Sequence, residues 1–246
     1  MDYSIDTCVD YTNEIQDRVA VWDRLKNSVK ENSRFFTNMD EFAQYEYLTA
    51  GKSLHIGQKL YRSRVTPIGQ KKIKWDKMGC PPKELTTAGR ANPIGIPYLY
   101  LSDSAKTTYF EVRAVYLDKL SVGTFRIEKD LKLIDFVYDV NLFLSYNDGS
   151  VPLKETIIKK KVIEAISSDL SKPLRRYDSE IEYVPTQLIC EYCRRIVDSE
   201  GATADGITFE SSLHKGGRNY VLFDESAAKC IRVDSHEITR IDIDRK

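Results

Sequence analysis

The segment from residue 66 to residue 97 limits most strongly what this chain can fold into, because five of the eight prolines lie within it. Proline lacks a backbone N–H, so it interrupts helices and the inner strands of sheets. The glycines between these prolines favour turns. The segment therefore predicts a long irregular loop, and loops of such length in compact domains usually have a function.

Short apolar runs on both sides of this loop predict strands, Leu60–Val65 before it and Tyr98–Leu101 after it. By the same criterion, further strands are predicted at residues 123–127, 131–136, 207–209, 220–223 and from 231 onward. Apolar residues at helical spacing predict helices at residues 11–30, 38–48, 155–170 and 185–199. Another helix is expected through Glu111 and Ala114, with Ser102 or Ser104 as its N-cap. The pattern predicts a mixed α/β or α+β domain behind a small helical N-terminal segment.

The composition argues against several classes of protein. Lys plus Arg and Asp plus Glu both number 37, so no net charge attracts the chain to nucleic acid or to an anionic membrane. No apolar run approaches the roughly 20 residues of a membrane span, and no signal peptide is evident. Five scattered cysteines fit a reducing compartment. We therefore expect a cytoplasmic protein that contacts neither a membrane nor nucleic acid directly.

Two polar segments near the loop are candidates for a site. Glycines and a proline surround Arg90 and Asn92, and an arginine in such a loop suits a phosphate because its planar fork donates two hydrogen bonds. The alternative is a tight turn with a solvated arginine. Glu111 follows the strand that contains Tyr100, and a carboxylate there can stabilise positive charge on a ribose ring. The alternative is an exposed glutamate that pairs weakly with Arg113.

A third polar segment lies near the C-terminus. It runs through residues 205–212, ends in Ser211 and Ser212, and is followed by a glycine-rich loop and by Asn219. Small hydroxyls and glycines permit the close approach of a ligand, whereas the alternative is a hairpin with a flexible loop.

Other patterns do not predict a metal or nucleotide site of a common type. Cys190 and Cys193 form one CxxC pair with no second pair, and a structural zinc ion needs four ligands. The histidines, His55, His214 and His236, are scattered along the chain. The sequence has neither a GxGxxG fingerprint nor a Walker A motif. We expect no metal and no cofactor.

Taken together, the polar segments resemble the RES domain, a family named for its arginine, glutamate and serine. The resemblance spans about residues 58 to 225 and includes the opening strand at residues 60–64. Its tightest part is the G-R-x-N-P-x-G block at residues 89–95, with Tyr100 ten residues after Arg90 and Glu111 eleven residues later. Ala91 departs from the aromatic residue that the family often has before the asparagine. The loop at 67–88 is family-variable, so its Lys72, Trp75 and Lys83 receive no role.

The resemblance implies an α+β fold similar to ADP-ribosyltransferase toxins, with a mixed sheet core and flanking helices. It implies a helical N-terminal segment at residues 1–55 and a RES-type catalytic domain at residues 56–246. Arg90, Tyr100 and Glu111 would be the catalytic residues. The family's serine falls on Ser211 or Ser212, with Ser211 slightly favoured. Residues expected to bind NAD, as substrate and not as cofactor, are Arg62, Arg64, Asn92, Ser211, Ser212 and Asn219.

The activity implied by the resemblance is cleavage of the nicotinamide–ribose bond of NAD, by an NAD+ glycohydrolase or phosphorylase. Such an enzyme would be a toxin or defence effector that depletes NAD. An ADP-ribosyltransferase that modifies a protein target is the alternative from the same site. A catalytically dead binding module and an unrelated α/β domain are further alternatives. Besides NAD, the expected partners are an antitoxin or regulatory protein and a second copy of the chain.

Overall fold

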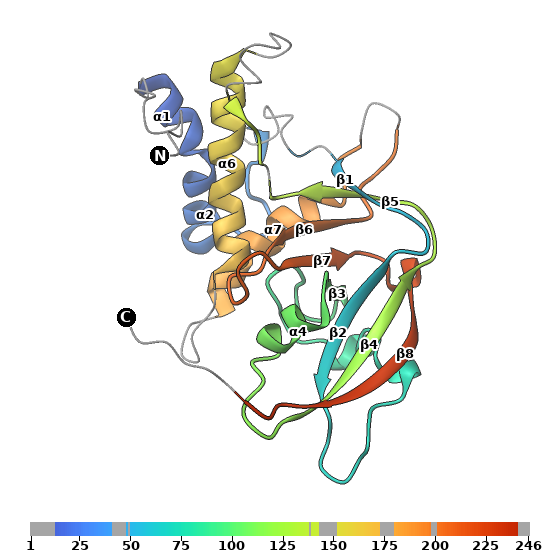
Figure 1. Ribbon diagram of the computed structural model, residues 1–246. Coiled ribbons are helices and arrows are strands. Elements are labelled where there is room, and N and C mark those ends of the chain that lie inside the picture. The colour runs from blue at the N-terminus through green and yellow to red at the C-terminus, as the bar shows by residue number, and fades with distance from the viewer. Residues whose placement is uncertain are drawn as a thin grey trace.

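The computed structural model describes residues 13–40, 48, 50–137, 139–142, 152–172, 180–197 and 201–240. These residues form an α+β fold in which one mixed sheet is flanked by helices (Figure 1). The described strands are β1 (Ala50–Leu54), β2 (Lys59–Val65), β3 (Leu99–Ser102), β4 (Lys119–Ile127), β5 (Leu131–Asp135), β6 (Gly206–Glu210), β7 (Arg218–Leu222) and β8 (Ala228–Glu237). The described α-helices are α1 (Asn13–Val19), α2 (Val21–Glu31), α4 (Ala105–Glu111), α6 (Leu153–Ser171) and α7 (Val184–Cys193). Short 3-10 turns are η2 (Trp75–Lys77), η3 (Lys83–Leu85), η4 (Glu180–Tyr183) and η5 (Glu225–Ala227).

The eight strands have the order β1-β5-β6-β7-β3-β2-β4-β8. Only β5 and β6 pair in parallel, whereas the other pairs between described strands are antiparallel. A parallel pair needs a long crossover connection, and here that connection contains α6 and α7. The two helices therefore return the chain to the middle of the sheet, where β6 and β7 lie beside β3.

The sheet separates two hydrophobic cores, and the residues in and just before β3 contribute side chains to both. Because side chains alternate along a strand, Leu99 and Leu101 face one core while Tyr98 and Tyr100 face the other. The tyrosine side packs against α1, α2, α6 and α7 (Figure 1). The leucine side is closed in part by the proline-rich loop, whose Met78 is wholly buried there.

Most predicted elements are present, and the errors have local causes. The helix predicted at 11–30 is two helices that meet at Ala20. Strand β1 was missed because Gly51, Lys52 and Ser53 give it no apolar alternation. The helix predicted to reach residue 199 ends at Cys193. The helix predicted at 38–48 lies largely outside the described residues.

The choice between the two predicted caps of α4 is settled by hydrogen bonding. Ser104 Oγ accepts a hydrogen bond from the backbone N–H of Thr107 at 3.1 Å, so Ser104 is the N-cap. Ser102 belongs to β3 instead. The helix then ends at Glu111, before the predicted Ala114.

The helices α1 and α2 share one core with α6 and α7, and Trp22 is the largest of their fully buried side chains. The division of the chain at residue 55 stays a prediction. Within the described ranges, no helix has both the length and the apolar character needed to cross a membrane.

Candidate active site

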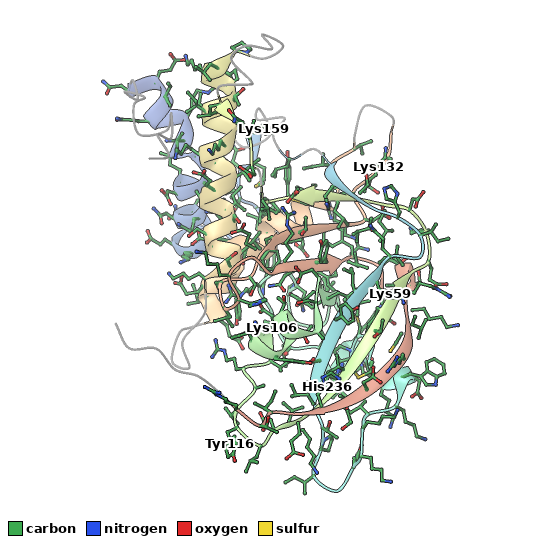
Figure 2. The ribbon with its side chains drawn as sticks, viewed as in Figure 1. Lys59, Lys106, Tyr116, Lys132, Lys159 and His236 are labelled. Carbon is green, nitrogen blue, oxygen red and sulfur yellow. The ribbon has the colours of Figure 1, made fainter. Side chains whose placement is uncertain are left out.

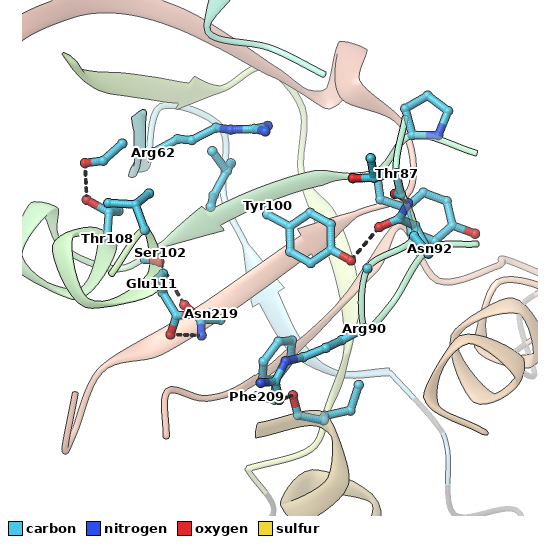
Figure 3. Close-up of a pocket in the computed structure, with 18 of the residues that line it drawn as sticks. Arg62, Thr87, Arg90, Asn92, Tyr100, Ser102, Thr108, Glu111, Phe209 and Asn219 are labelled. Atoms are coloured by element: carbon cyan, nitrogen blue, oxygen red, sulfur yellow. Dashed lines mark hydrogen bonds between the residues drawn. The ribbon is translucent and has the colours of Figure 1, made fainter. Parts of the chain in front are cut away.

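A cavity of about 390 Å³ opens where β2, β3 and α4 meet the loop that precedes β3 and the C-terminal end of α6 (Figure 3). Its volume lies within the range of small-molecule sites. Its wall is polar in part, with side chains from segments that are far apart in the sequence.

The carboxylate of Glu111 is held at the cavity wall by two donors. Ser211 Oγ donates to Glu111 Oε1 at 2.7 Å, and Asn219 Nδ2 donates to the same oxygen at 2.8 Å. Asn219 is itself oriented by Ser102, whose hydroxyl donates to Asn219 Oδ1 at 2.8 Å. Ser102 and Asn219 are register partners in the β3–β7 ladder, so the sheet fixes their contact. Hydrogen bonds to an ionised carboxylate are among the stronger ones, and these orient Glu111.

Tyr100 and Asn92 tie the loop of residues 89–95 to the sheet (Figure 3). The Tyr100 hydroxyl donates to Asn92 Oδ1 at 2.8 Å and accepts from the backbone N–H of Ala91 at 3.0 Å. Burial raises the pKa of Tyr100 above its usual range. Gln187 on α7 donates to the carbonyls of Gly89 and Asn92, at 2.8 and 3.0 Å. The neutral phenol therefore shapes the loop and lines the cavity.

Arg90 extends from this loop toward the end of α6. Its Nη1 donates to the backbone carbonyl of Leu170 at 2.7 Å. Leu170 lies in the last turn of α6, where carbonyls lack intrahelical donors and the helix dipole favours cations. Burial lowers the pKa of Arg90, and the guanidinium remains charged at neutral pH because arginine is a very strong base.

Arg62 on β2 places a second guanidinium at the cavity. Its Nη1 is buried and has no hydrogen-bond partner among the described residues. Burial, followed by the nearby charge of Arg64, lowers the pKa of Arg62 to about 10. A buried donor without an acceptor is unfavourable by roughly 1–3 kcal/mol. The Arg62 side chain also lines the cavity, so it places positive charge beside the space that an anionic ligand would fill.

The cavity collects most of the predicted site residues, which are Arg62, Arg90, Asn92, Tyr100, Glu111, Ser212 and Asn219. Two predicted residues are not in its lining. Ser211 is buried against Glu111. Arg64 instead donates to the carbonyl of Gly79 at 2.8 Å.

Three contributors to the site were not predicted from the sequence. Ser102 was considered only as a helix cap, although its place two residues after Tyr100 puts it on the same face of the strand. Gln187 lies within a predicted helix, and its contact with Gly89 had no sequence signal. Tyr183 lines the cavity from η4, a segment for which no role was predicted.

The histidines and the CxxC pair do not line the cavity. His214 contacts Thr107 Oγ1 at 3.0 Å through Nδ1. His236, which is labelled on β8 in Figure 2, contacts the hydroxyl of Tyr109. Cys190 and Cys193 are buried as free thiols in α7. In the part of the chain that the structure describes, no three His, Cys, Asp or Glu side chains are grouped to hold a metal ion.

Comparison with known proteins identifies the family of this chain. The model of the RES domain matches residues 59–243, and that family is associated in general with toxins that act on NAD. No curated protein and no solved structure matches the chain. The matched region includes every residue that lines the cavity. Because the match covers most of its length, this chain belongs to the RES domain family.

Proposed function

We propose that the protein cleaves the nicotinamide–ribose bond of NAD in this cavity, as an NAD+ glycohydrolase or phosphorylase. The observation on which the proposal rests is the oriented carboxylate of Glu111 in one cavity with the guanidinium groups of Arg62 and Arg90. A dinucleotide presents complementary groups, since its pyrophosphate is anionic and its reacting ribose becomes cationic.

Glu111 would stabilise the reacting sugar. Breaking the bond to nicotinamide gives the ribose oxocarbenium character, as in glycoside cleavage. Nicotinamide leaves as a neutral molecule from a cationic precursor, so the reaction needs little acid catalysis. Both donors to Glu111 reach Oε1, and no hydrogen bond from the described residues reaches Oε2. That second oxygen is available to a ribose hydroxyl and to the developing positive charge.

Arg62 and Arg90 would bind the pyrophosphate. Guanidinium groups donate paired hydrogen bonds to phosphate oxygens, and Nη1 of Arg62 lacks an acceptor within the described protein. Arg64 would act only from outside the cavity, since it is bound to Gly79. Its charge still adds to the positive potential around Arg62.

Tyr100 would position the nicotinamide through its ring, because its hydroxyl already holds Asn92 and Ala91. In this assignment Asn92 keeps the loop in shape. Ser211 and Asn219 orient Glu111, and Ser212, which lines the cavity, would meet the ribose or the amide directly.

The acceptor of the ADP-ribosyl group defines the reaction. Water would make the protein a glycohydrolase, inorganic phosphate would make it a phosphorylase, and a protein side chain would make it an ADP-ribosyltransferase. Depletion of NAD in the cytoplasm fits a toxin or defence effector, whose natural partner would be an antitoxin or regulatory protein. Pairing with a second copy of the chain remains part of the proposal.

The deciding experiment incubates the purified protein with NAD, with and without inorganic phosphate, and separates the products by chromatography. We expect free nicotinamide together with ADP-ribose or its phosphorylated form. Glu111→Gln should abolish turnover while the thermal unfolding temperature stays unchanged. The matched control is Glu237→Gln, which removes an exposed carboxylate on β8.

Two results would contradict the proposal. Full turnover in a folded Glu111→Gln variant would remove the catalytic role of the carboxylate. Absence of nicotinamide release from NAD, both alone and with labelled NAD in a cell lysate, would exclude cleavage by water, phosphate or a protein acceptor.

A further inference from the structure

Three side chains of α2 face the C-terminal end of α6, where the carbonyl of Leu170 binds Arg90. Trp22, Lys26 and Lys30 follow one another at four-residue intervals, so they lie along one side of α2. Figure 1 shows α2 beside α6, and both helices belong to the same core. The N-terminal segment therefore lies next to the part of the cavity wall that contains Arg90.

The first link from α2 runs through Asp169 on α6. Trp22 Nε1 donates to Asp169 Oδ2 at 2.7 Å, and Lys26 Nζ donates to the same oxygen at 3.0 Å. Burial disfavours the charge on Lys26, but its hydrogen bonds with Asp23 and Asp169 outweigh burial and raise its pKa. Lys26 is therefore charged at neutral pH, and it holds the Asp169 side chain together with Trp22.

Asp169 immediately precedes Leu170, whose carbonyl accepts the hydrogen bond from Arg90 at 2.7 Å. Helix ends fray readily because their last carbonyls lack intrahelical donors. Two donors on Asp169 hold the final turn of α6 against α2, so the position of the Leu170 carbonyl is fixed.

A second link reaches Arg90 from the other side. Lys30 forms an ion pair with Glu182 at 2.8 Å, and Glu182 precedes Tyr183 in η4. Tyr183 and Arg90 line the main cavity together. Both also line a small neighbouring hollow whose wall includes Lys26 and Lys30. Arg90 is therefore bordered by two elements that α2 holds in place.

We propose that α2 is a positioning element of the NAD site, in which Trp22, Lys26 and Lys30 fix Arg90 through the end of α6 and through η4. This inference rests on the proposed role of Arg90 in binding NAD. It makes the N-terminal helical segment part of the substrate site and not only a structural appendage. None of the three residues lines the main cavity.

The test compares two ion pairs that dock the N-terminal helices on α6. Asp169→Asn weakens the link beside Arg90, and Lys26→Met weakens it from the other partner while it keeps the aliphatic stem. The matched control is Glu155→Gln, because Arg18 binds Glu155 through two contacts of 2.6 and 2.7 Å. Glu155 lies about 21 Å from Asp169 along α6, at 1.5 Å per residue.

We expect Asp169→Asn and Lys26→Met each to raise the KM for NAD by about threefold to tenfold, with kcat changed by less than about twofold. Glu155→Gln should leave the KM unchanged. In an Arg90→Ala background the effect of Asp169→Asn on the KM should disappear, because the residue through which it acts is gone. An equal rise of the KM in Glu155→Gln, or an undiminished effect in the Arg90→Ala background, would overturn the inference.

Hydrogen exchange supplies a measurement that does not depend on turnover. Asp169→Asn should accelerate amide exchange in residues 86–95, whereas Glu155→Gln should not. Unchanged exchange there in both Asp169→Asn and Lys26→Met would refute positioning even if NAD is cleaved. A wild-type protein that does not cleave NAD would refute the proposed function alone, since exchange still reports whether α2 positions the Arg90 loop.

Discussion

Removal of the Ser211 hydroxyl tests whether Glu111 is oriented by the geometry described above. Ser211→Ala deletes the donor that lies 2.7 Å from Glu111 Oε1. It also deletes the acceptor for the backbone N–H groups of Leu213 and His214, at 3.3 and 3.1 Å. A hydrogen bond to a charged group contributes roughly 1.5–3 kcal/mol. If that contribution is realised in the transition state, turnover should fall about 10-fold to 150-fold.

The assay is kcat/KM for nicotinamide release, measured beside thermal unfolding. Ser212→Ala is the matched control, because Ser212 is exposed and forms no hydrogen bond with the described residues. It should reduce kcat/KM by less than about fivefold, the effect of one ligand contact. Asn219 remains as the second donor, so Ser211→Ala should retain some activity. A larger loss in Ser212→Ala than in Ser211→Ala would refute the assignment and would make Ser212 the functional serine.

Three further predictions concern Gly89, Arg62 and Cys80. Gly89→Ala would place a Cβ 2.8 Å from Tyr100 Oη. It should therefore lower the free energy of unfolding by about 1–3 kcal/mol and reduce turnover, as measured by thermal unfolding and by kinetics. Gly79→Ala is the control, because its Cβ meets only an ordinary contact at 3.4 Å, so stability and turnover should both stay unchanged. Arg62→Met should raise the unfolding temperature, because it removes Nη1, a buried donor with no hydrogen-bond partner among the described residues. It should also abolish NAD binding, because it removes a charge proposed to bind the pyrophosphate. A lower unfolding temperature would contradict the first expectation. Burial raises the pKa of Cys80 from 9.0 to about 12. The native thiol should therefore stay protonated at pH 9.5 and react slowly with iodoacetamide, while the unfolded chain ionises first and stability falls above pH 9.

Several parts of this protein could be predicted from the sequence, because they depend on local chemistry. Prolines and glycines at residues 66–97 predicted the loop, since they act on the backbone they belong to. Short apolar runs predicted β2 and β3. The spacing of Arg90, Tyr100 and Glu111 led to the family, which the match over residues 59–243 confirmed.

Contacts between distant segments could not be predicted in this way. Period-two alternation puts Arg62 and Arg64 on the same face of β2, so the sequence treats them alike. The packing of the loop separates them, because the carbonyl of Gly79 binds Arg64, while Nη1 of Arg62 is buried with no partner in the described part of the chain. Likewise, nothing near Trp22 in the sequence indicates a link to Arg90.

The sequence by itself therefore determined which residue types this protein offers and the order in which they come. Only the tertiary structure decided which of them meet. Ser211 and Ser212 are neighbours with the same side chain, yet one is buried against Glu111 and the other is exposed. The physical reason is that a hydrogen bond depends on distance and direction, and between distant segments the packing of the whole sheet and its helices sets both.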